Sequence, residues 1–360
     1  MHHLFLGLDP AELGVAPFAL TIDGGYETHA TACGLAIAPG AYVYALPCIA
    51  GYVGADAAGV ALAETPYLSD ELTLIADVGT NAEILFGDRR GLLACSSPTG
   101  PAFEGAQISC GQRAAPGAIE RVRIDRRTLE PRFKVIGCEL WSDEPGFPEA
   151  IKTIGVTGIC GSGIIEAIAE MFLSGIISHD GAMVGALAEK TRRVERAGRT
   201  FAYVLKQGEP RLAIDQADVR AVQLAKAALY AGAKLLIEKR GAGPPQRITL
   251  VGAFGSQIDP VYAMALGLIP DCDLAKVAAG GNAAGAGACI ALVNLSARAE
   301  IEKVVRAIDK VETAIDPRFQ DEFVAAMALP HASDSFENLA KTIQLPARKA
   351  VEAARRRRGE

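Results

Sequence analysis

Asp77 and Thr80 are the residues whose types and spacing point most directly to chemistry. They stand in the segment Asp-Val-Gly-Thr-Asn, directly after the apolar run at residues 72–76. A tight turn after a buried strand presents amides to a phosphate, Gly79 lets the main chain approach it, and the Thr80 hydroxyl can bond an oxygen. The Asp77 carboxylate can hold Mg²⁺ through water. The alternative is a hairpin turn that Asp77 and Asn81 merely stabilise.

Two glycine-rich segments further along the chain have a similar character. Gly252-Ala-Phe-Gly255 follows an apolar run, and its missing side chains would let a flat ring lie against the main chain. A strand-to-helix turn that needs a positive φ is the alternative. Gly158-Ile-Cys-Gly-Ser-Gly163 precedes a predicted helix, for which Ser162 is the expected N-cap. Cys160 there is either a thiol beside an anion-binding helix start or a small buried residue.

Three charged residues complete the candidates. Glu104 and Arg113 lie in a Gly-rich loop, where a charged side chain can face a ligand and Arg113 can pair with a phosphate. Asp56 stands at the start of a predicted helix and is the candidate for a catalytic acid. The alternatives are solvated loop charges for the first two and a simple helix-dipole partner for Asp56.

The predicted elements place these segments at strand ends and helix starts. Apolar runs predict a buried strand within 41–51, a strand over 72–76 that returns through Glu83-Ile-Leu-Phe, and a short strand at 248–251. Helices are expected from Asp56 onward and over 164–173, 218–239 and 284–310. Strands with exposed faces are expected within 119–154, a loop over 95–118 and irregular structure over 180–217. Repeated glycine turns after strands favour amides that converge on an anion between two lobes.

Composition excludes several classes of protein. The 360 residues correspond to roughly two domains, half of them are hydrophobic, and a net charge of -6 gives no sign of nucleic-acid binding. The uncharged stretches 30–55 and 277–297 are rich in small residues or broken by Pro and Gly, so a small-residue loop and a buried helix are expected for the second and no membrane span for either. Eight cysteines without a C-x-x-C pair indicate reduced, mostly buried thiols in a cytoplasmic protein, and no histidine spacing indicates zinc.

Four segments occur in an order typical of one family. They are Asp77-Val-Gly-Thr-Asn-Ala-Glu, Cys95-Ser-Ser-Pro-Thr-Gly-Pro-Ala-Phe-Glu-Gly-Ala, Gly158-Ile-Cys-Gly-Ser-Gly and Val251-Gly-Ala-Phe-Gly. With them, residues 1–332 resemble the C-terminal ATPase domain of the reductive activators of corrinoid proteins, from the acetate and sugar kinase, heat-shock chaperone and actin superfamily. The resemblance implies an α/β, two-lobed actin-like ATPase fold, with mixed sheets flanked by helices and an incomplete first lobe.

The resemblance also implies a division of the chain and of the site. Residues 1–70 would be a remnant of the first ATPase lobe, 71–332 the second lobe with the phosphate and adenosine motifs, and 333–360 a basic C-terminal tail. With the candidates above, the expected site has Asp77 and Asp56 as catalytic residues, Asp77 as the metal ligand, and a nucleotide-binding set of Gly79, Thr80, Asn81, Glu104, Arg113, Gly161, Ser162, Gly163, Gly252, Ala253, Phe254 and Gly255.

Members of the family return cobalt(II) corrinoids to cobalt(I), using ATP and an N-terminal [2Fe-2S] domain. The implied cofactors are therefore ATP and Mg²⁺, and the implied partners are a corrinoid protein of a methyltransferase system and a second copy of the chain, with neither nucleic acid nor membrane. This sequence departs from the family in having no closely spaced cysteine cluster and no upstream Asp-x-Gly-Thr-Thr hairpin. A truncated chain is expected, with the [2Fe-2S] group only in a missing N-terminal domain and ATP hydrolysis by this chain alone left open.

Three other functions stay open at this point. A [4Fe-4S] activator of the 2-hydroxyacyl-CoA dehydratase type would use Cys160 as a cluster ligand. A partner-docking module would have lost nucleotide chemistry altogether. A small-molecule kinase would need a catalytic acid facing the γ-phosphate, for which Asp56 is the candidate.

Overall fold

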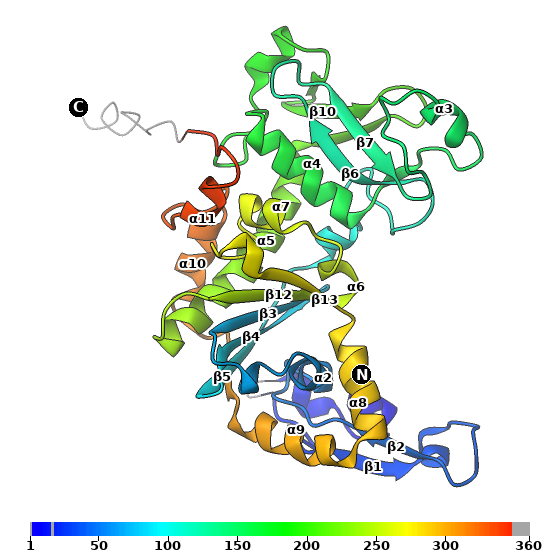
Figure 1. Ribbon diagram of the computed structural model, residues 1–360, viewed down its shortest axis with the longest axis vertical. Coiled ribbons are helices and arrows are strands. Elements are labelled where there is room, and N and C mark those ends of the chain that lie inside the picture. The colour runs from blue at the N-terminus through cyan, green and yellow to red at the C-terminus, as the bar shows by residue number, and fades with distance from the viewer. Residues whose placement is uncertain (1, 16–17, 348–360) are drawn as a thin grey trace.

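The computed structural model describes residues 2–15 and 18–347, and a six-stranded mixed sheet lies at its centre (Figure 1). Three consecutive strands form an antiparallel meander: β3 (Thr73–Val78), β4 (Ala82–Asp88) and β5 (Gly91–Ser97). Three later strands join in parallel: β12 (Arg247–Val251) beside β3, β13 (Val277–Gly281) beside β12, and β14 (Asp309–Lys310) beside β5. The order β13-β12-β3-β4-β5-β14 therefore brings β12 next to β3 although about half the chain separates them.

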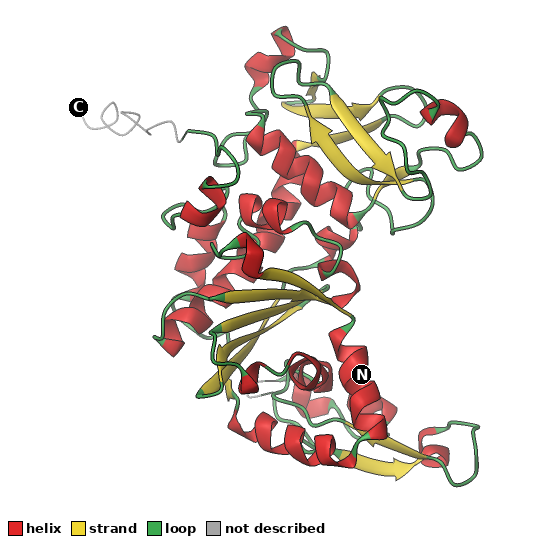
Figure 2. Ribbon diagram, in the orientation of Figure 1, coloured by secondary structure: helices red, strands yellow, loops and turns green. Residues whose placement is uncertain are grey.

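Helices cover both faces of this sheet. Alternate residues of β3 and β4 point to opposite faces. Leu74 and Phe86 join the core that contains α5 (Gln216–Arg240), on which α10 (Phe319–Ala326) packs. Ile75 and Leu85 join a second core with three helices: α2 (Ala55–Glu64), α8 (Ala283–Val293) and α9 (Leu295–Ala307). The expected mixed sheet flanked by helices is therefore present (Figure 2).

A β-rich part lies beyond α5, at the upper end of the elongated molecule (Figures 1 and 2). One sheet has the order β7-β6-β8, from β6 (Ala118–Ile124), β7 (Pro131–Val135) and β8 (Gly158–Ile159). Its other elements are α3 (Phe147–Ala150), α4 (Gly161–Leu173) and a sheet of β9 (Val194–Ala197), β10 (Thr200–Lys206) and β11 (Leu212–Asp215). Helix α4 packs both on β6 and on α7 (Pro260–Leu266), which lies nearer the centre of the molecule, so α4 ties the β-rich part to that centre (Figure 1).

The ends of the described chain lie on different parts. Near the N-terminus, α1 (His2–Phe5) precedes a two-stranded sheet of β1 (Tyr26–His29) and β2 (Tyr42–Ala45), at the lower end in Figure 1. Near the C-terminus, α11 (Glu337–Ala340) buries Leu339 completely. The rest of the predicted basic tail, from residue 348 on, lies outside the described residues.

Several element predictions are wrong in detail. The segment 180–217 is not irregular, because it contains β9, β10 and β11. The helix expected over 284–310 is two helices, α8 and α9, that meet at Asn294. The strand expected within 41–51 forms as β2 but is half-exposed rather than buried, with Tyr42 55% exposed.

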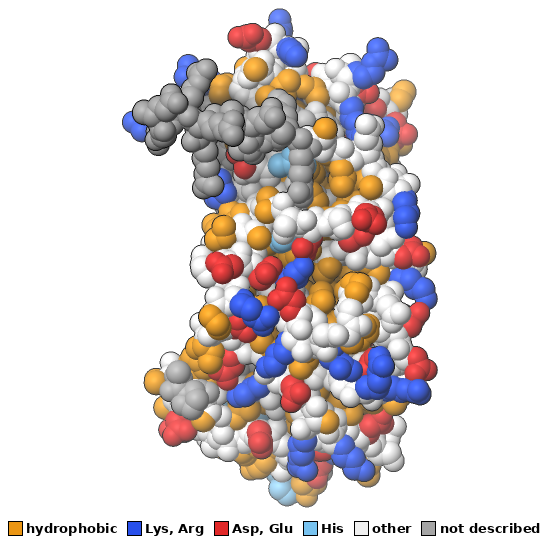
Figure 3. Space-filling view, turned by 90° about the vertical axis from the view of Figure 1, so that its left-hand side faces the viewer, with side chains coloured by type: hydrophobic (Ala, Val, Ile, Leu, Met, Phe, Trp, Pro, Cys, Tyr) orange, Lys and Arg blue, Asp and Glu red, His pale blue; other side chains and the backbone are white. Residues whose placement is uncertain are grey.

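The uncharged stretch 277–297 also differs from its prediction. It opens with a strand, β13, rather than a loop. Its helix α8 buries only Ala283, Gly287 and Ala291, while Leu292 and Val293 are exposed. Within residues 2–15 and 18–347 no helix combines the length and apolarity needed to cross a membrane. On the face drawn in Figure 3, acidic and basic side chains are interspersed.

Candidate functional site

Asp77 lies at the carboxyl end of β3, next to the turn Gly79-Thr80-Asn81 that leads into β4. Thr99 fixes this turn, because its Oγ1 donates to the carbonyls of Gly79 at 2.9 Å and Thr80 at 3.0 Å. The carbonyl of Thr80 also accepts from the Gly100 amide at 2.8 Å. The carbonyl oxygens of Gly79 and Thr80 therefore accept hydrogen bonds within the protein, while the Thr80 and Asn81 amides donate to no other group of the described chain. Two free amides beside a hydroxyl can bind an anion.

The turn after β12 lies directly against Asp77. Parallel pairing places Val251 opposite Asp77, and Gly252, with φ +90°, begins α6 (Gly252–Gly255). A methyl group at Gly252 would overlap with the Asp77 carboxylate. Gly252 is therefore required both by its left-handed conformation and by the space that Asp77 occupies. Two segments far apart in the sequence meet here, as predicted.

The start of α4 closes the other side of this group. The rings of Phe103 and Phe254 stack with centroids 5.8 Å apart, and Gly161 lies so close to the Phe103 carbonyl and the Phe254 ring that a methyl group would overlap with both. Next to Phe103, Glu104 accepts a hydrogen bond from Thr80 Oγ1 at 2.6 Å. The contacts run from Asp77 through α6 to α4, and from α4 through the Glu104 loop back to Thr80.

Three carboxylates from three elements lie near one another at the base of the turn. Glu83 of β4 pairs with Asp77 across the hairpin, and Asp56 lies in the first turn of α2. Burial raises the pKa of Asp77, and the charge of Asp56 raises it further. Burial raises the pKa of Glu83 to about 7, with Asp56 and Asp77 adding to the effect. A cavity of about 430 Å³ opens beside Asp56 and Glu83.

Sequence reasoning missed Glu83 and Thr99 as members of this group. The signal for Glu83 was present, because a hairpin that pairs residue 78 with 82 must also pair 77 with 83. Both residues therefore belong to one side of the hairpin. Nothing in the local sequence distinguishes Thr99, whose role arises from the fold of the loop after β5.

The oxygen ligands at the turn suit Mg²⁺. This cation binds through one or two carboxylates, keeps several waters and is completed by substrate phosphates. Asp77 and the Thr80 hydroxyl would supply oxygen donors there, while the free amides of the turn would face phosphate oxygens. In the described part of the chain no three His, Cys, Asp or Glu residues are placed to form an all-protein metal site, so water and phosphate would complete the coordination.

The other predicted residues have less direct positions. Ser162 is not the N-cap of α4, because Cys160 occupies that position and Ser162 is already helical. Gly163 packs against the Ile119 carbonyl, which explains its lack of a side chain. Arg113 is exposed, as is Ala253. Their predicted roles at a nucleotide stay predictions, as does that of Gly255, which is buried.

Cys160 is placed as a small buried residue. It is 2% exposed, and its Sγ lies 3.3 Å from the Ile119 carbonyl. A cluster shared across a dimer surface needs accessible thiolates, so this position does not suit one. All eight cysteines are free thiols, of which Cys289 alone is exposed while Cys33 and Cys110 are half-buried.

Comparison with known proteins gives consistent matches over nearly the whole chain. The model of the C-terminal domain of RACo, the ASKHA domain, matches residues 71–340, and the model of the RACo middle region matches residues 1–66. A solved structure, a reductive activator for corrinoid,iron-sulfur protein, superimposes with a TM-score of 0.79 at 32% identity, over 92% of this chain and 51% of that chain.

Two curated proteins match as well. The corrinoid activation enzyme RamQ of Eubacterium limosum is 34% identical over 336 residues, which cover 90% of this chain and 54% of RamQ. The Co(II) methylated amine-specific corrinoid protein reductase of Methanosarcina barkeri is 28% identical over 235 residues, 62% of this chain and 39% of the reductase. The chain thus spans about half the length of RamQ, and less of the reductase.

Proposed function

The chain belongs to the RACo family, whose ASKHA domain and middle region it matches, and from this premise we propose that it binds Mg²⁺-ATP at the Asp77 turn and serves the reductive activation of a corrinoid protein. The resemblance drawn from its sequence motifs is confirmed by these matches, and so is the ASKHA fold. RamQ and the other relatives are described as acting on corrinoid proteins, which supports a partner of that class.

One observation carries the nucleotide proposal. The turns after β3 and β12 and the start of α4 form a closed set of contacts, in which the Gly252 main chain lies against Asp77, Gly161 against Phe254, and Glu104 against Thr80. Segments 175 positions apart thus bring free amides, a hydroxyl and a carboxylate close together, which is typical of a ligand-binding site.

The side chains divide the proposed work. Asp77 and the Thr80 hydroxyl oxygen would hold the magnesium, and the turn amides would orient phosphate oxygens. Glu83 has a pKa close to neutrality, which suits a group that accepts a proton from an attacking water. Its position directly opposite Asp77, on the neighbouring strand, keeps it within the same group of carboxylates.

The reduction itself adds one electron to cobalt(II) in the partner. We place the donor, a [2Fe-2S] group, outside this chain, because the eight cysteines here are scattered single thiols. The contribution of this chain would be coupling: nucleotide states that bind the partner's states differently shift their equilibrium, tenfold for about each 1.4 kcal/mol. Homodimer formation and a cytoplasmic location stay predictions, and sedimentation of the purified chain tests the first.

Calorimetry with ATP and Mg²⁺ on this chain tests the nucleotide site directly. We expect one ATP per chain in the presence of Mg²⁺, and loss of the binding heat with Asp77→Asn. Absence of binding would contradict the proposal and favour a partner-docking module without nucleotide chemistry. If ATP binds, recovery of a cobalt(I) corrinoid protein with an added electron donor should depend on ATP. Recovery at the same rate without ATP would refute the coupling.

A further inference from the structure

The β6–β7 hairpin carries four cations on one side in two directly opposed pairs. Arg123 of β6 lies opposite Arg132 of β7, and Arg121 lies opposite Lys134. Because like charges directly opposite each other weaken an antiparallel pair, this arrangement costs stability. The neighbours on the other side of both strands are core residues such as Val122, so folding alone does not call for the cations.

Counter-charges in the structure only partly neutralise these four residues. The buried carboxylate of Glu166, on α4, accepts from Arg121 at 2.7 Å and from Arg123 at 2.5 Å, and thus serves two guanidinium groups at once. Arg132 is 3.9 Å from Asp143, and Lys134 is 3.5 Å from Glu139, whose side chain is fully solvent-exposed. Exposed pairs of this kind contribute little. This side of the β6–β7 hairpin therefore keeps an excess of positive charge.

Trp141, the only tryptophan of the chain, lies among the same cations. Arg132 and Arg123 lie over its ring with distances of 4.8 Å and 5.7 Å to the centroid, and Lys134 Nζ lies at 5.9 Å. Such stacking holds the guanidinium groups in fixed positions while their outer N–H groups stay available. We call Arg121, Arg123, Arg132, Lys134 and Trp141 the cationic face.

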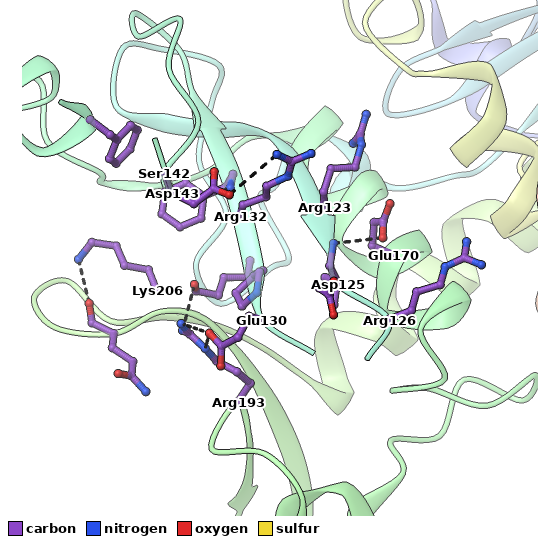
Figure 4. Close-up of a pocket in the computed structure, with 16 residues that line it drawn as sticks. Arg123, Asp125, Arg126, Glu130, Arg132, Ser142, Asp143, Glu170, Arg193 and Lys206 are labelled. Carbon is purple, nitrogen blue, oxygen red and sulfur yellow. Dashed lines mark hydrogen bonds and ion pairs between the residues drawn. The ribbon is translucent and has the colours of Figure 1, made fainter. Parts of the chain in front are cut away.

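A cavity of about 850 Å³ opens beside the cationic face (Figure 4). Arg126 lines it and has no hydrogen-bond or ion-pair partner in the described chain. The acids of the same cavity are largely used: Asp125 accepts from the Arg127 and Thr128 amides of its own turn, and Glu170 accepts from the Ile124 amide and the Tyr262 hydroxyl. Among the cations, Arg193 pairs with Glu130 and Lys206 donates to main-chain carbonyls, so Arg126 is the charged group of the cavity that a ligand can pair with directly.

We propose that the cationic face and the adjoining Arg126 form the docking surface for an acidic protein surface, and that its occupant is the corrinoid protein. The identity of the occupant rests on the proposed function, whereas the acidic chemistry rests on the residues alone. Exposed Glu130 and Asp143 at the margin would repel the phosphates fixed along a nucleic-acid backbone, whereas carboxylates on flexible polypeptide side chains can turn away from them.

The position of this surface also suits a partner whose binding responds to nucleotide. Glu166 lies on α4, five residues from Gly161 at the candidate nucleotide site, which is about 8 Å along a helix. A partner that draws Arg121 and Arg123 away from Glu166 would therefore act on the helix that closes this site. Differential binding of this kind is what couples two sites.

Trp141 makes the docking surface directly measurable. We expect poly-L-glutamate to bind the full chain with a saturable change in tryptophan fluorescence that salt weakens, and titration calorimetry should give the same affinity. Arg132→Glu and Arg126→Glu should each weaken it by about tenfold, as expected for reversal of an interface charge. Arg89→Glu, at an exposed arginine on the β4–β5 turn, is the matched control and should leave binding unchanged. Circular dichroism confirms that each variant is folded.

Other results would overturn the proposal. They are binding of inorganic pyrophosphate as tight as that of poly-L-glutamate, tighter binding of single-stranded DNA, or no binding of poly-L-glutamate at all. Calorimetry with Mg²⁺-ATP separates this proposal from the function. Retained ATP binding in a chain that does not bind poly-L-glutamate contradicts the docking surface alone. The reverse pattern contradicts the nucleotide function and removes the corrinoid protein as occupant. With a corrinoid protein, Arg132→Glu should weaken the complex by the same factor.

Discussion

Asp77 and Asp88 stand at opposite ends of the β3–β4 hairpin in opposite electrostatic environments. Burial and then Asp56 raise the pKa of Asp77, whereas Arg90 lowers the pKa of Asp88 to about 2. Asp77→Asn should therefore raise the melting temperature, because it removes a charge that the native state disfavours. Asp88→Asn should lower it, because a favourable partner of Arg90 and Arg240 is lost.

The two substitutions should also differ in their effect on the rate of ATP hydrolysis. Asp77→Asn should slow ATP hydrolysis by about a hundredfold or more, since the metal contributes several kcal/mol of charge stabilisation. Asp88→Asn should leave the rate within a factor of about two, because no ligand reaches that end of the hairpin in the proposed site. Equal loss of activity in both variants would mean that Asp77 acts only on stability.

Glu83 gives the molecule a pH dependence of defined sign. Its pKa rises from an ordinary 4.5 to about 7, so between these values the folded chain holds a proton that the unfolded chain has released. The free energy of unfolding should therefore fall as pH rises through this window, by on the order of 3 kcal/mol. Urea unfolding from pH 4.5 to 8 measures this fall, and Glu83→Gln should reduce its slope. An unchanged slope in that variant would assign the fall to other groups.

At the scale of elements, the N-terminus of α5 holds the loop that carries Glu104. Asp215 caps α5 by accepting from the amides of Ala217 and Asp218 at 2.8 and 3.0 Å. Buried Asp218 also accepts from the Ser109 amide at 2.8 Å and the Ser109 hydroxyl at 2.7 Å. The first interaction is local to the helix, whereas the second reaches the loop that follows Glu104.

Substitution of these two aspartates should separate helix stability from loop position. Asp215→Ala should cost about 1 kcal/mol of stability and leave the affinity for Mg²⁺-ATP unchanged. Asp218→Ala should cost about 2 kcal/mol, because it removes the hydrogen bonds that the buried Asp218 carboxylate accepts from Ser109 and from the Asp215 amide, and should also weaken Mg²⁺-ATP binding. Chemical unfolding and calorimetry on both variants measure the two effects. Unchanged ATP affinity in Asp218→Ala would show that the loop keeps its position without this contact.

The same elements show what the sequence can and cannot predict. The β3–β4 hairpin and α5 were predictable because their apolar periodicity and turn or cap residues agree. Strand β13, Val-Ala-Ala-Gly-Gly, has little strand propensity of its own and forms because β12 offers an unpaired edge. The break at Asn294 was readable in retrospect, since its side chain accepts from the amides of Ser296 and Ala297 as an N-cap.

For the candidate site, the sequence predicted the turns but not how they are held. Asp77 and Gly252 were expected near one ligand, and the parallel pairing of β12 with β3 brings them into contact. The support of the turn by Thr99 and the approach of Gly161 to Phe254 depend on tertiary packing, which leaves no periodic signal in a single sequence. The sequence predicted Ser162 as the N-cap of α4, whereas the structure has Cys160 there. Errors of one or two residues are expected at helix ends.

At the scale of the whole molecule, the proposed nucleotide site lies where two parts of the molecule meet that share one hydrophobic core. The β3–β4 turn belongs to the central sheet, whereas α4 packs on β6 of the β-rich part. A ligand that contacts both must stabilise both together. Hydrogen exchange should therefore show that Mg²⁺-ATP slows exchange of the amides of the β3–β4 turn and of the first turn of α4, with the same midpoint. At a hundred times the dissociation constant, the chain should gain about 2.7 kcal/mol of stability.

The control for this experiment is Asp77→Asn, in which both segments should lose protection because the metal ligand is gone. The control reports on coupling because α6 connects residue 77 with α4: its Gly252 lies against Asp77, and its Phe254 lies against Gly161. Protection of the hairpin without α4 would place the ligand on the central sheet alone and contradict a site shared by the two parts. Protection of α4 in Asp77→Asn would instead show that nucleotide binds at the helix start without the hairpin, and the proposed division of roles would be wrong.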